Sequence, residues 1–102
     1  KICFIQEYIP QNLYGINGGH LRFDFAIIEN NNIKRLIEFD GPQHNKFTNF
    51  FNDETDFLAL QEHDKRKNDY SLKEGIPLVR IPYQVRNKIT IEDILTDKFL
   101  VK

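Results

Sequence analysis

Three acidic residues lie in two short apolar segments, at a spacing that could bring their carboxylates together. Asp24 lies in the first segment, residues 21–28, whereas Glu38 and Asp40 lie in the second, residues 34–40. Because side chains repeat every two residues along a strand, Glu38 and Asp40 are expected to point the same way. Carboxylate oxygens are the ligands that Mg²⁺ prefers, and Mn²⁺ takes the same ligands.

The residues between the two segments predict a hairpin. Glu29 to Asn32 form a polar stretch that tolerates left-handed backbone angles, which favours a tight turn between antiparallel strands. In the first strand, alternation predicts one face made of Arg22, Asp24 and Ala26 and another made of Leu21, Phe23, Phe25 and Ile27. The hairpin would hold three carboxylates close together. Their mutual repulsion requires a cation, for which a divalent metal is the natural candidate.

The length and composition of the chain indicate one small globular domain. It has 102 residues, of which 40% are hydrophobic and 28% are charged, so a single core is expected. The net charge of −1 neither favours nor excludes a nucleic-acid partner. Cys3 is the only cysteine, which excludes an internal disulfide and fits the reducing cytoplasm. No apolar run is long enough to span a membrane, and the start at Lys1 within an apolar run indicates a piece of a longer chain.

The remaining segments complete the expected fold. They are a strand over residues 1–9, a loop over residues 10–20, a helix that ends at Gly75, a buried strand over residues 76–81 and a short helix capped by Thr90. Their order predicts an α+β fold. A three-stranded antiparallel meander is followed by a helix and by a further strand that completes a mixed sheet, and a short C-terminal helix ends the chain.

Three other residues could contribute to the chemistry. His44 follows the glycine turn at the end of the acid-bearing strand, and imidazole ionises near neutral pH, so we expect it to act in catalysis. Asp64 continues the helix face that carries Phe57 and Leu60, where it would orient His44 or a site lysine. Glu7 is either a fourth acid near the site or a residue of an edge strand whose faces are mixed.

The expected helix also carries a run of basic residues. Lys65, Arg66 and Lys67 are consecutive, so on a helix they radiate over about 200° and cannot all face the core. A run of this kind is either a solvated helix face or a surface that contacts phosphates. Such contacts would position a nucleic acid without reading its sequence.

Four motifs, in order and suitably spaced, resemble the PD-(D/E)XK nuclease superfamily. They are FDFAI, IEFDGPQH, HDKRKNDY and LVRIPY, and they are similar to the branch related to very-short-patch-repair endonucleases, in particular to phage-encoded homing endonucleases with an EDxHD active-site pattern. The resemblance implies a restriction-endonuclease-like core, double-stranded DNA as partner and Mg²⁺ as cofactor, in a phage-encoded or bacterial intracellular protein. Nothing in the chain looks like a base-reading module, so a DNA-targeting domain is expected outside this fragment.

Carried over by position, the resemblance assigns roles to five residues. Asp24 matches the first metal-binding acid of the superfamily, and Glu38 matches the second. Asp40 stands where the better-known pattern has a lysine, which implies that another residue must handle the water or the leaving group. His44 matches the histidine after the glycine turn, and Asp64 matches the acid on the helix. The residue that supplies the first E of the branch pattern stays open.

The implied reaction is metal-dependent hydrolysis of a DNA phosphodiester bond. Mg²⁺ held by Asp24, Glu38 and Asp40 would neutralise charge on the phosphate, and His44 would accept a proton from the attacking water. The alternatives are a mismatch-nicking repair endonuclease on the same fold, a nuclease-fold module that binds nucleic acid without cutting, and an acidic structural hairpin without metal. With one active site per chain, a double-strand break would need a homodimer or two successive nicks.

Overall fold

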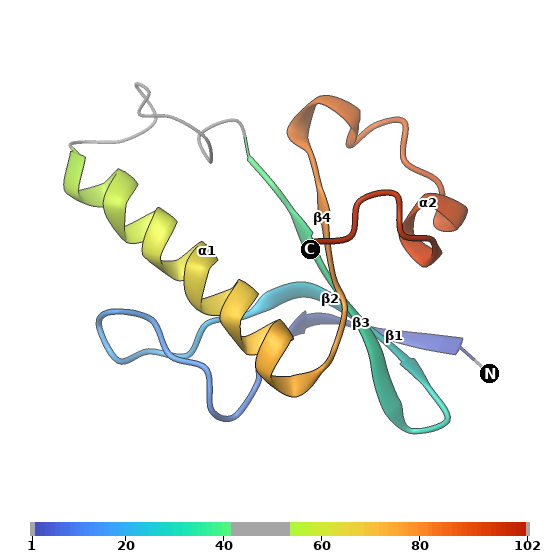
Figure 1. Cartoon of the computed structure of the whole chain (residues 1–102), viewed down its shortest axis with the longest axis horizontal. Helices are drawn as coiled ribbons and strands as arrows, with labels where there is room; N and C mark the ends of the chain where they lie inside the picture. The colour runs from blue at the N-terminus through green and yellow to red at the C-terminus, as the bar shows by residue number, and fades with distance from the viewer. Residues whose placement is uncertain (1, 42–53, 102) are drawn as a thin grey trace.

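The computed structural model describes residues 2–41 and 54–101, which form one four-stranded mixed sheet with a long helix against it (Figure 1). The elements, in chain order, are β1 (Ile2–Tyr8), β2 (Phe23–Glu29), β3 (Asn32–Phe39), α1 (Glu54–Glu74), β4 (Leu78–Ile81), the 3-10 helix η1 (Tyr83–Val85) and α2 (Ile91–Leu95). The α+β fold expected from the sequence is confirmed. No helix within residues 2–41 and 54–101 is long and apolar enough to cross a membrane.

The strands lie in the order β1-β2-β3-β4. The first three are antiparallel neighbours, and the hairpin between β2 and β3 turns at Asn30 and Asn31. These two residues have φ angles of 54° and 64°, in the left-handed region that asparagine tolerates. After α1 the chain returns in β4, which pairs with β3 in parallel. The carboxyl ends of β3 and β4 therefore lie at the same edge of the sheet.

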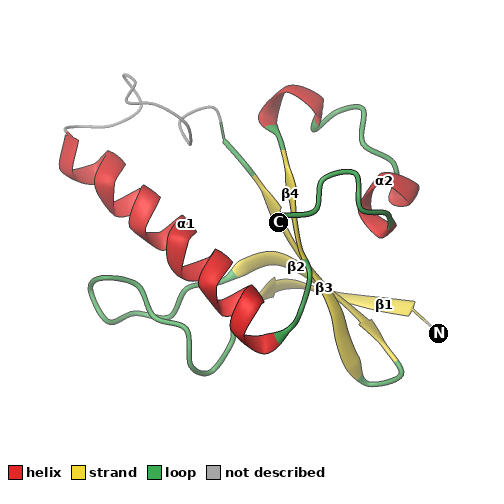
Figure 2. Cartoon of the chain, viewed as in Figure 1, coloured by secondary structure: helices red, strands yellow, loops and turns green. Residues whose placement is uncertain are grey.

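Two clusters of apolar side chains cover the two faces of the sheet. Leu36 and Leu78 belong to one cluster and their neighbours Ile37 and Val79 to the other, as strand alternation requires. Helix α1 contacts the first cluster through Tyr70. The chain that follows β4 covers the second cluster (Figure 2), with Val85, Ile89, Ile94, Phe99 and Leu100. The central strands are therefore buried on both faces.

The alternation predicted for β2 is wrong at the start of the strand. Phe23 packs in the cluster that contains Ala26, whereas Phe25 packs with Ile27 in the other. On the neighbouring strand β1, at the same level, Glu7 has a φ of 51°. A bulge-like irregularity of this kind rotates a strand and sends neighbouring side chains to unexpected faces. The regular alternation of side chains along β2 is therefore interrupted at Asp24, between Phe23 and Phe25.

Helix α1 turns a polar face toward the sheet. Lys67 forms a hydrogen bond with Glu38 of β3, and Asn68 accepts one from Arg80 of β4. These two residues lie three and four positions after Asp64, on the helix face that the sequence pattern assigned to Asp64. The helix ends before Gly75, as predicted, and this glycine has a φ of 68° that a side chain would disfavour.

Candidate functional site

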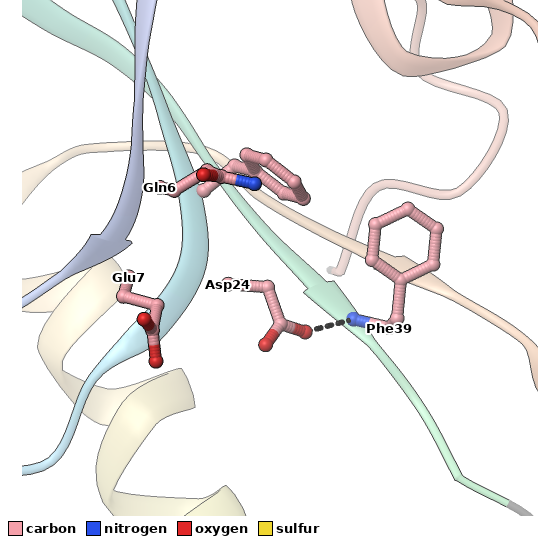
Figure 3. A pocket seen from close by; sticks show the side chains of 5 residues that line it. Gln6, Glu7, Asp24 and Phe39 are labelled. Carbon is pink, nitrogen blue, oxygen red and sulfur yellow. Dashed lines mark hydrogen bonds between the residues drawn. The ribbon is translucent and has the colours of Figure 1, made fainter.

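Asp24 and Glu38 lie where β2 and β3 separate. The last backbone pair of the two strands joins Phe25 to Ile37. Beyond it, the Asp24 backbone N–H donates to Glu38 Oε1 at 3.0 Å. The Phe39 N–H donates to Asp24 Oδ2 at 2.7 Å, the hydrogen bond drawn in Figure 3. Each carboxylate therefore takes the place of a backbone carbonyl for the opposite strand. The two acids fix the point at which the strands diverge.

Glu38 is the buried member of this acid pair. It is 6% exposed, and its Oε2 accepts a hydrogen bond from Lys67 Nζ at 2.9 Å. The Lys67 side chain is 13% exposed, and its ammonium lies 5.6 Å from the centre of the Phe23 ring. Burial raises the pKa of the Glu38 carboxyl above its ordinary value, and Lys67 offsets this effect only in part. The nearby carboxylate of Asp24 raises the pKa of Glu38 further.

Asp40, directly after β3, is paired with an arginine. Its Oδ1 lies 2.9 Å from Arg80 Nη1. Arg80 also donates from Nε to Asn68 Oδ1 at 3.1 Å, and its Nη1 lies 3.6 Å from Asp64 Oδ1. The side chains of Arg80, Asp40 and Asp64 are all mostly buried. This network connects the ends of β3 and β4 to the middle of α1.

An open pocket of about 520 Å³ adjoins Asp24. The residues that line it are Gln6, Glu7, Asp24, Phe25 and Phe39. Figure 3 shows the side chains of Glu7 and Asp24 extending in the same direction from neighbouring strands. Glu7 Oε1 lies 3.3 Å from Arg22 Nη1. Both side chains are 66% exposed, so this ion pair holds them only weakly. The pocket gives water and small polar groups access to the Asp24 carboxylate.

The structure brings together two of the three predicted carboxylates. Asp24 and Glu38 meet, whereas Asp40 is bonded to Arg80. Lys67 and Arg80 supply the positive charge that the sequence argument assigned to a metal. Among the residues that the structure describes, no group of three or more His, Cys, Asp or Glu side chains is arranged to hold a metal ion. The repulsion between the acids therefore does not by itself indicate a metal.

The other predicted residues have different outcomes. His44 lies outside the described residues, so its catalytic role stays a prediction. Asp64 does lie in the site, where it contacts Arg80 of β4. Glu7 reaches the pocket that adjoins Asp24, which favours its interpretation as a fourth acid near the site.

The three basic residues of α1 point in different directions, as the helix geometry predicted. Lys65 is 69% exposed and pairs with Asp69 at 3.0 Å, whereas Arg66 is half-buried and pairs with Glu62 at 2.7 Å. Lys67 turns to the sheet instead. Its predicted role as a surface contact for phosphate is therefore replaced by the buried contact with β3, because a helix rotates by about 100° per residue.

Lys67 and Arg80 are the site residues that the sequence did not identify as partners of the acids. The position of each residue in the sequence nevertheless indicated that it faces the acids. Arg80 is the single charged residue of β4 and lies two positions after the buried Leu78, on the face that carries Glu38. Lys67 lies three residues after Asp64, on the same side of the helix.

Of the three predicted acids, Asp24 is the one most accessible to a divalent cation. Asp24 accepts one described hydrogen bond, through Oδ2, and adjoins the open pocket, while Glu38 brings a second carboxylate to the same point. Carboxylate oxygens are the donors that hard cations prefer. Glu38 and Asp40 each already have a cationic partner, Lys67 and Arg80 respectively, which would repel a second cation at those carboxylates.

Comparison with known protein families, characterised proteins and solved structures found no match to this chain. The family resemblance of its motifs therefore stays a prediction. The fold and the site define an α+β domain with a buried acid–lysine pair beside an open, partly acidic pocket.

Proposed function

We propose that this domain is a metal-dependent endonuclease that hydrolyses phosphodiester bonds in double-stranded DNA. The observation that carries the proposal is the pairing of Asp24 and Glu38 where β2 and β3 diverge, with Lys67 bound to Glu38. Replacing a buried ion pair by apolar packing is often neutral or stabilising, so stability alone does not explain such a pair, and perturbed carboxylates concentrate at functional sites. The same two acids occupy the metal-binding positions of the nuclease motifs that the sequence resembles.

Phosphodiester hydrolysis requires a positioned water, neutralised phosphoryl oxygens and a stabilised leaving oxygen. Asp24 and Glu38 would hold Mg²⁺ or Mn²⁺, and the bound ion would neutralise phosphate charge and lower the pKa of water. Lys67 holds Glu38 Oε2 and so fixes the direction of that carboxylate, which is a positioning role. The nuclease pattern that the sequence resembles has a lysine where this chain has Asp40. The ammonium of Lys67 would supply the positive charge of that missing lysine. His44 remains the proposed general base.

A second candidate function is a module that binds nucleic acid without cutting it. The observation that favours it is that Glu38 and Asp40 already have Lys67 and Arg80 as partners. Because these two carboxylates already have cationic partners, the site needs no metal ion to offset their negative charge. A mismatch-nicking endonuclease would use the same chemistry as the first proposal, but its product would be nicks confined to mispaired sites.

The test is the conversion of supercoiled plasmid to nicked or linear plasmid, with Mg²⁺ and with EDTA. The nuclease proposal predicts conversion only when the metal is present. Asp24→Asn protein, purified in the same way, controls for contaminating nucleases, and its amide oxygen can still accept the Phe39 N–H. Absence of both conversion and metal binding would reject the nuclease proposal. DNA binding without conversion would support the non-cleaving module.

The proposal also covers the cellular location of the domain and the source of its target specificity. We place it in the cytoplasm, as a part of a longer protein whose other domain selects the DNA target. Because each chain has one site, the nuclease would make a double-strand break as a homodimer or by two successive nicks. The form of the plasmid product distinguishes these routes, since successive nicks accumulate open circles before linear DNA.

A further inference from the structure

The segment that follows β4 is basic and exposed. Residues 83–88, YQVRNK, contain Arg86 and Lys88 and no acidic residue. The segment forms η1 and the turn after it, and the side chains of Gln84, Arg86, Asn87 and Lys88 are all exposed. Its polar side chains can all donate hydrogen bonds, and two of them carry positive charge.

This segment begins beside the candidate site. Because β3 and β4 are parallel, both end at the same edge of the sheet, where the Asp40 N–H donates to the Ile81 carbonyl at 2.9 Å. Tyr83 is two residues beyond Ile81, so its Cα lies within about 7 Å of that contact. Figure 1 shows the orange turn after β4 at the end of the sheet where β3 also ends.

Arg86 is held in an ordered position by Tyr83. The guanidinium carbon lies 3.7 Å from the centre of the Tyr83 ring, and Nη1 donates to the Tyr83 carbonyl at 3.0 Å. Within residues 2–41 and 54–101, no salt bridge engages Arg86 or Lys88. Lys65, in contrast, is already paired with Asp69 of its own helix.

We propose that residues 83–88 bind the phosphate backbone of the double-stranded DNA that enters the site, an inference that rests on the proposed function. A guanidinium stacked on an aromatic ring loses less freedom on binding, and its planar fork matches phosphate oxygens. Lys88 adds a second charge, and Gln84 and Asn87 add neutral donors. Contacts of this kind position the duplex and carry no sequence information.

The experiment measures binding of the chain to a fluorescent duplex of about 20 base pairs in EDTA, which stops metal-dependent cleavage, over a range of salt concentrations. Each lost phosphate contact lowers the slope of log affinity against log salt by about 1. We expect Arg86→Gln and Lys88→Gln each to weaken binding about fivefold to tenfold near 0.1 M salt. Arg86→Lys should recover part of the affinity, because it keeps the charge but loses the planar fork.

The matched control is Lys34→Gln, which removes the same charge from an exposed residue at the opposite end of β3. It should leave the affinity and the salt slope unchanged. Wild-type binding too weak to measure at low salt, or equal binding by the double variant Arg86→Gln/Lys88→Gln, would overturn the proposal. Binding that depends on Arg86, in a protein that neither cleaves plasmid nor binds the metal, would support this surface and reject the nuclease activity.

Discussion

At the scale of single residues, the buried ion pair between Glu38 and Lys67 is the most consequential feature. Both side chains are largely removed from solvent, so removing either leaves a charge without its partner. We expect Lys67→Met to lower the free energy of unfolding by about 3 kcal/mol, measured by urea denaturation. Lys65→Met is the matched control, because Lys65 is 69% exposed and should matter by less than about 0.5 kcal/mol. Equal effects of the two substitutions would contradict the account of the pair.

Glu38 should also give the protein a characteristic pH dependence. Its pKa in the folded state is raised above the ordinary value of 4.5, so the folded state binds the proton more tightly than the unfolded state. The stability that protonated Glu38 contributes is complete below pH 4.5 and is lost as the pH rises through the raised pKa. Relative to Glu38→Gln, the wild-type protein should therefore gain stability as the pH falls from 7 toward 4.5. A difference that stays flat, or falls, over this interval would show that the pKa is not raised.

At the scale of elements, the loop between β1 and β2 is fixed to α1. His63 Nε2 of the helix accepts a hydrogen bond from the Ile16 N–H at 3.1 Å, and Arg66 donates to the Tyr14 carbonyl at 3.1 Å. Gly15 lies under this contact, where an added Cβ would come within 2.8 Å of His63 Nε2. A side chain at this position would therefore displace either the His63 ring or the loop.

Gly15→Ala should accordingly displace the loop from the helix. We expect a loss of about 1 to 3 kcal/mol in the free energy of unfolding, from overpacking and from the weakened hydrogen bond of His63. Gly19→Ala is the control in the same loop, since a Cβ there meets no atom within 4 Å. Thermal unfolding of the two variants measures the difference. A Gly15→Ala protein as stable as Gly19→Ala would show that the loop is not held in this way.

Much of the element structure was predictable because it is encoded locally. The asparagine turn sets the β2–β3 hairpin, and Gly75 ends α1. The positions of Phe23 and Phe25 on opposite faces of the sheet were not predictable, because side chains alternate regularly only along an undistorted strand. The alternation is broken at Asp24, opposite the left-handed Glu7 of the neighbouring strand. Such irregularities depend on pairing between strands, which a pattern read along one strand does not contain.

At the scale of the whole molecule, the site is assembled from segments far apart in the chain. The acids Asp24 and Glu38 belong to one hairpin, so their proximity followed from the sequence. The cationic partner of Glu38 comes from α1 and that of Asp40 from β4, and the contact between Lys67 and Glu38 joins residues 29 positions apart. The sequence located the polar face of the helix but not the strand that it would contact. For this reason the partner of Lys67 could not be predicted from the sequence.

The proposed nuclease activity depends on Asp24, so the decisive measurement is the cleavage rate of the Asp24→Asn protein. Asp69→Asn is the matched control, because it makes the same chemical change at a carboxylate that is 59% exposed on α1. With both variants shown to be folded by thermal unfolding, we predict that Asp24→Asn cleaves plasmid at least about 100-fold more slowly than wild type in Mg²⁺. Asp69→Asn should cleave at the wild-type rate. A folded Asp24→Asn protein that also keeps the wild-type rate would show that Asp24 has no role in cleavage.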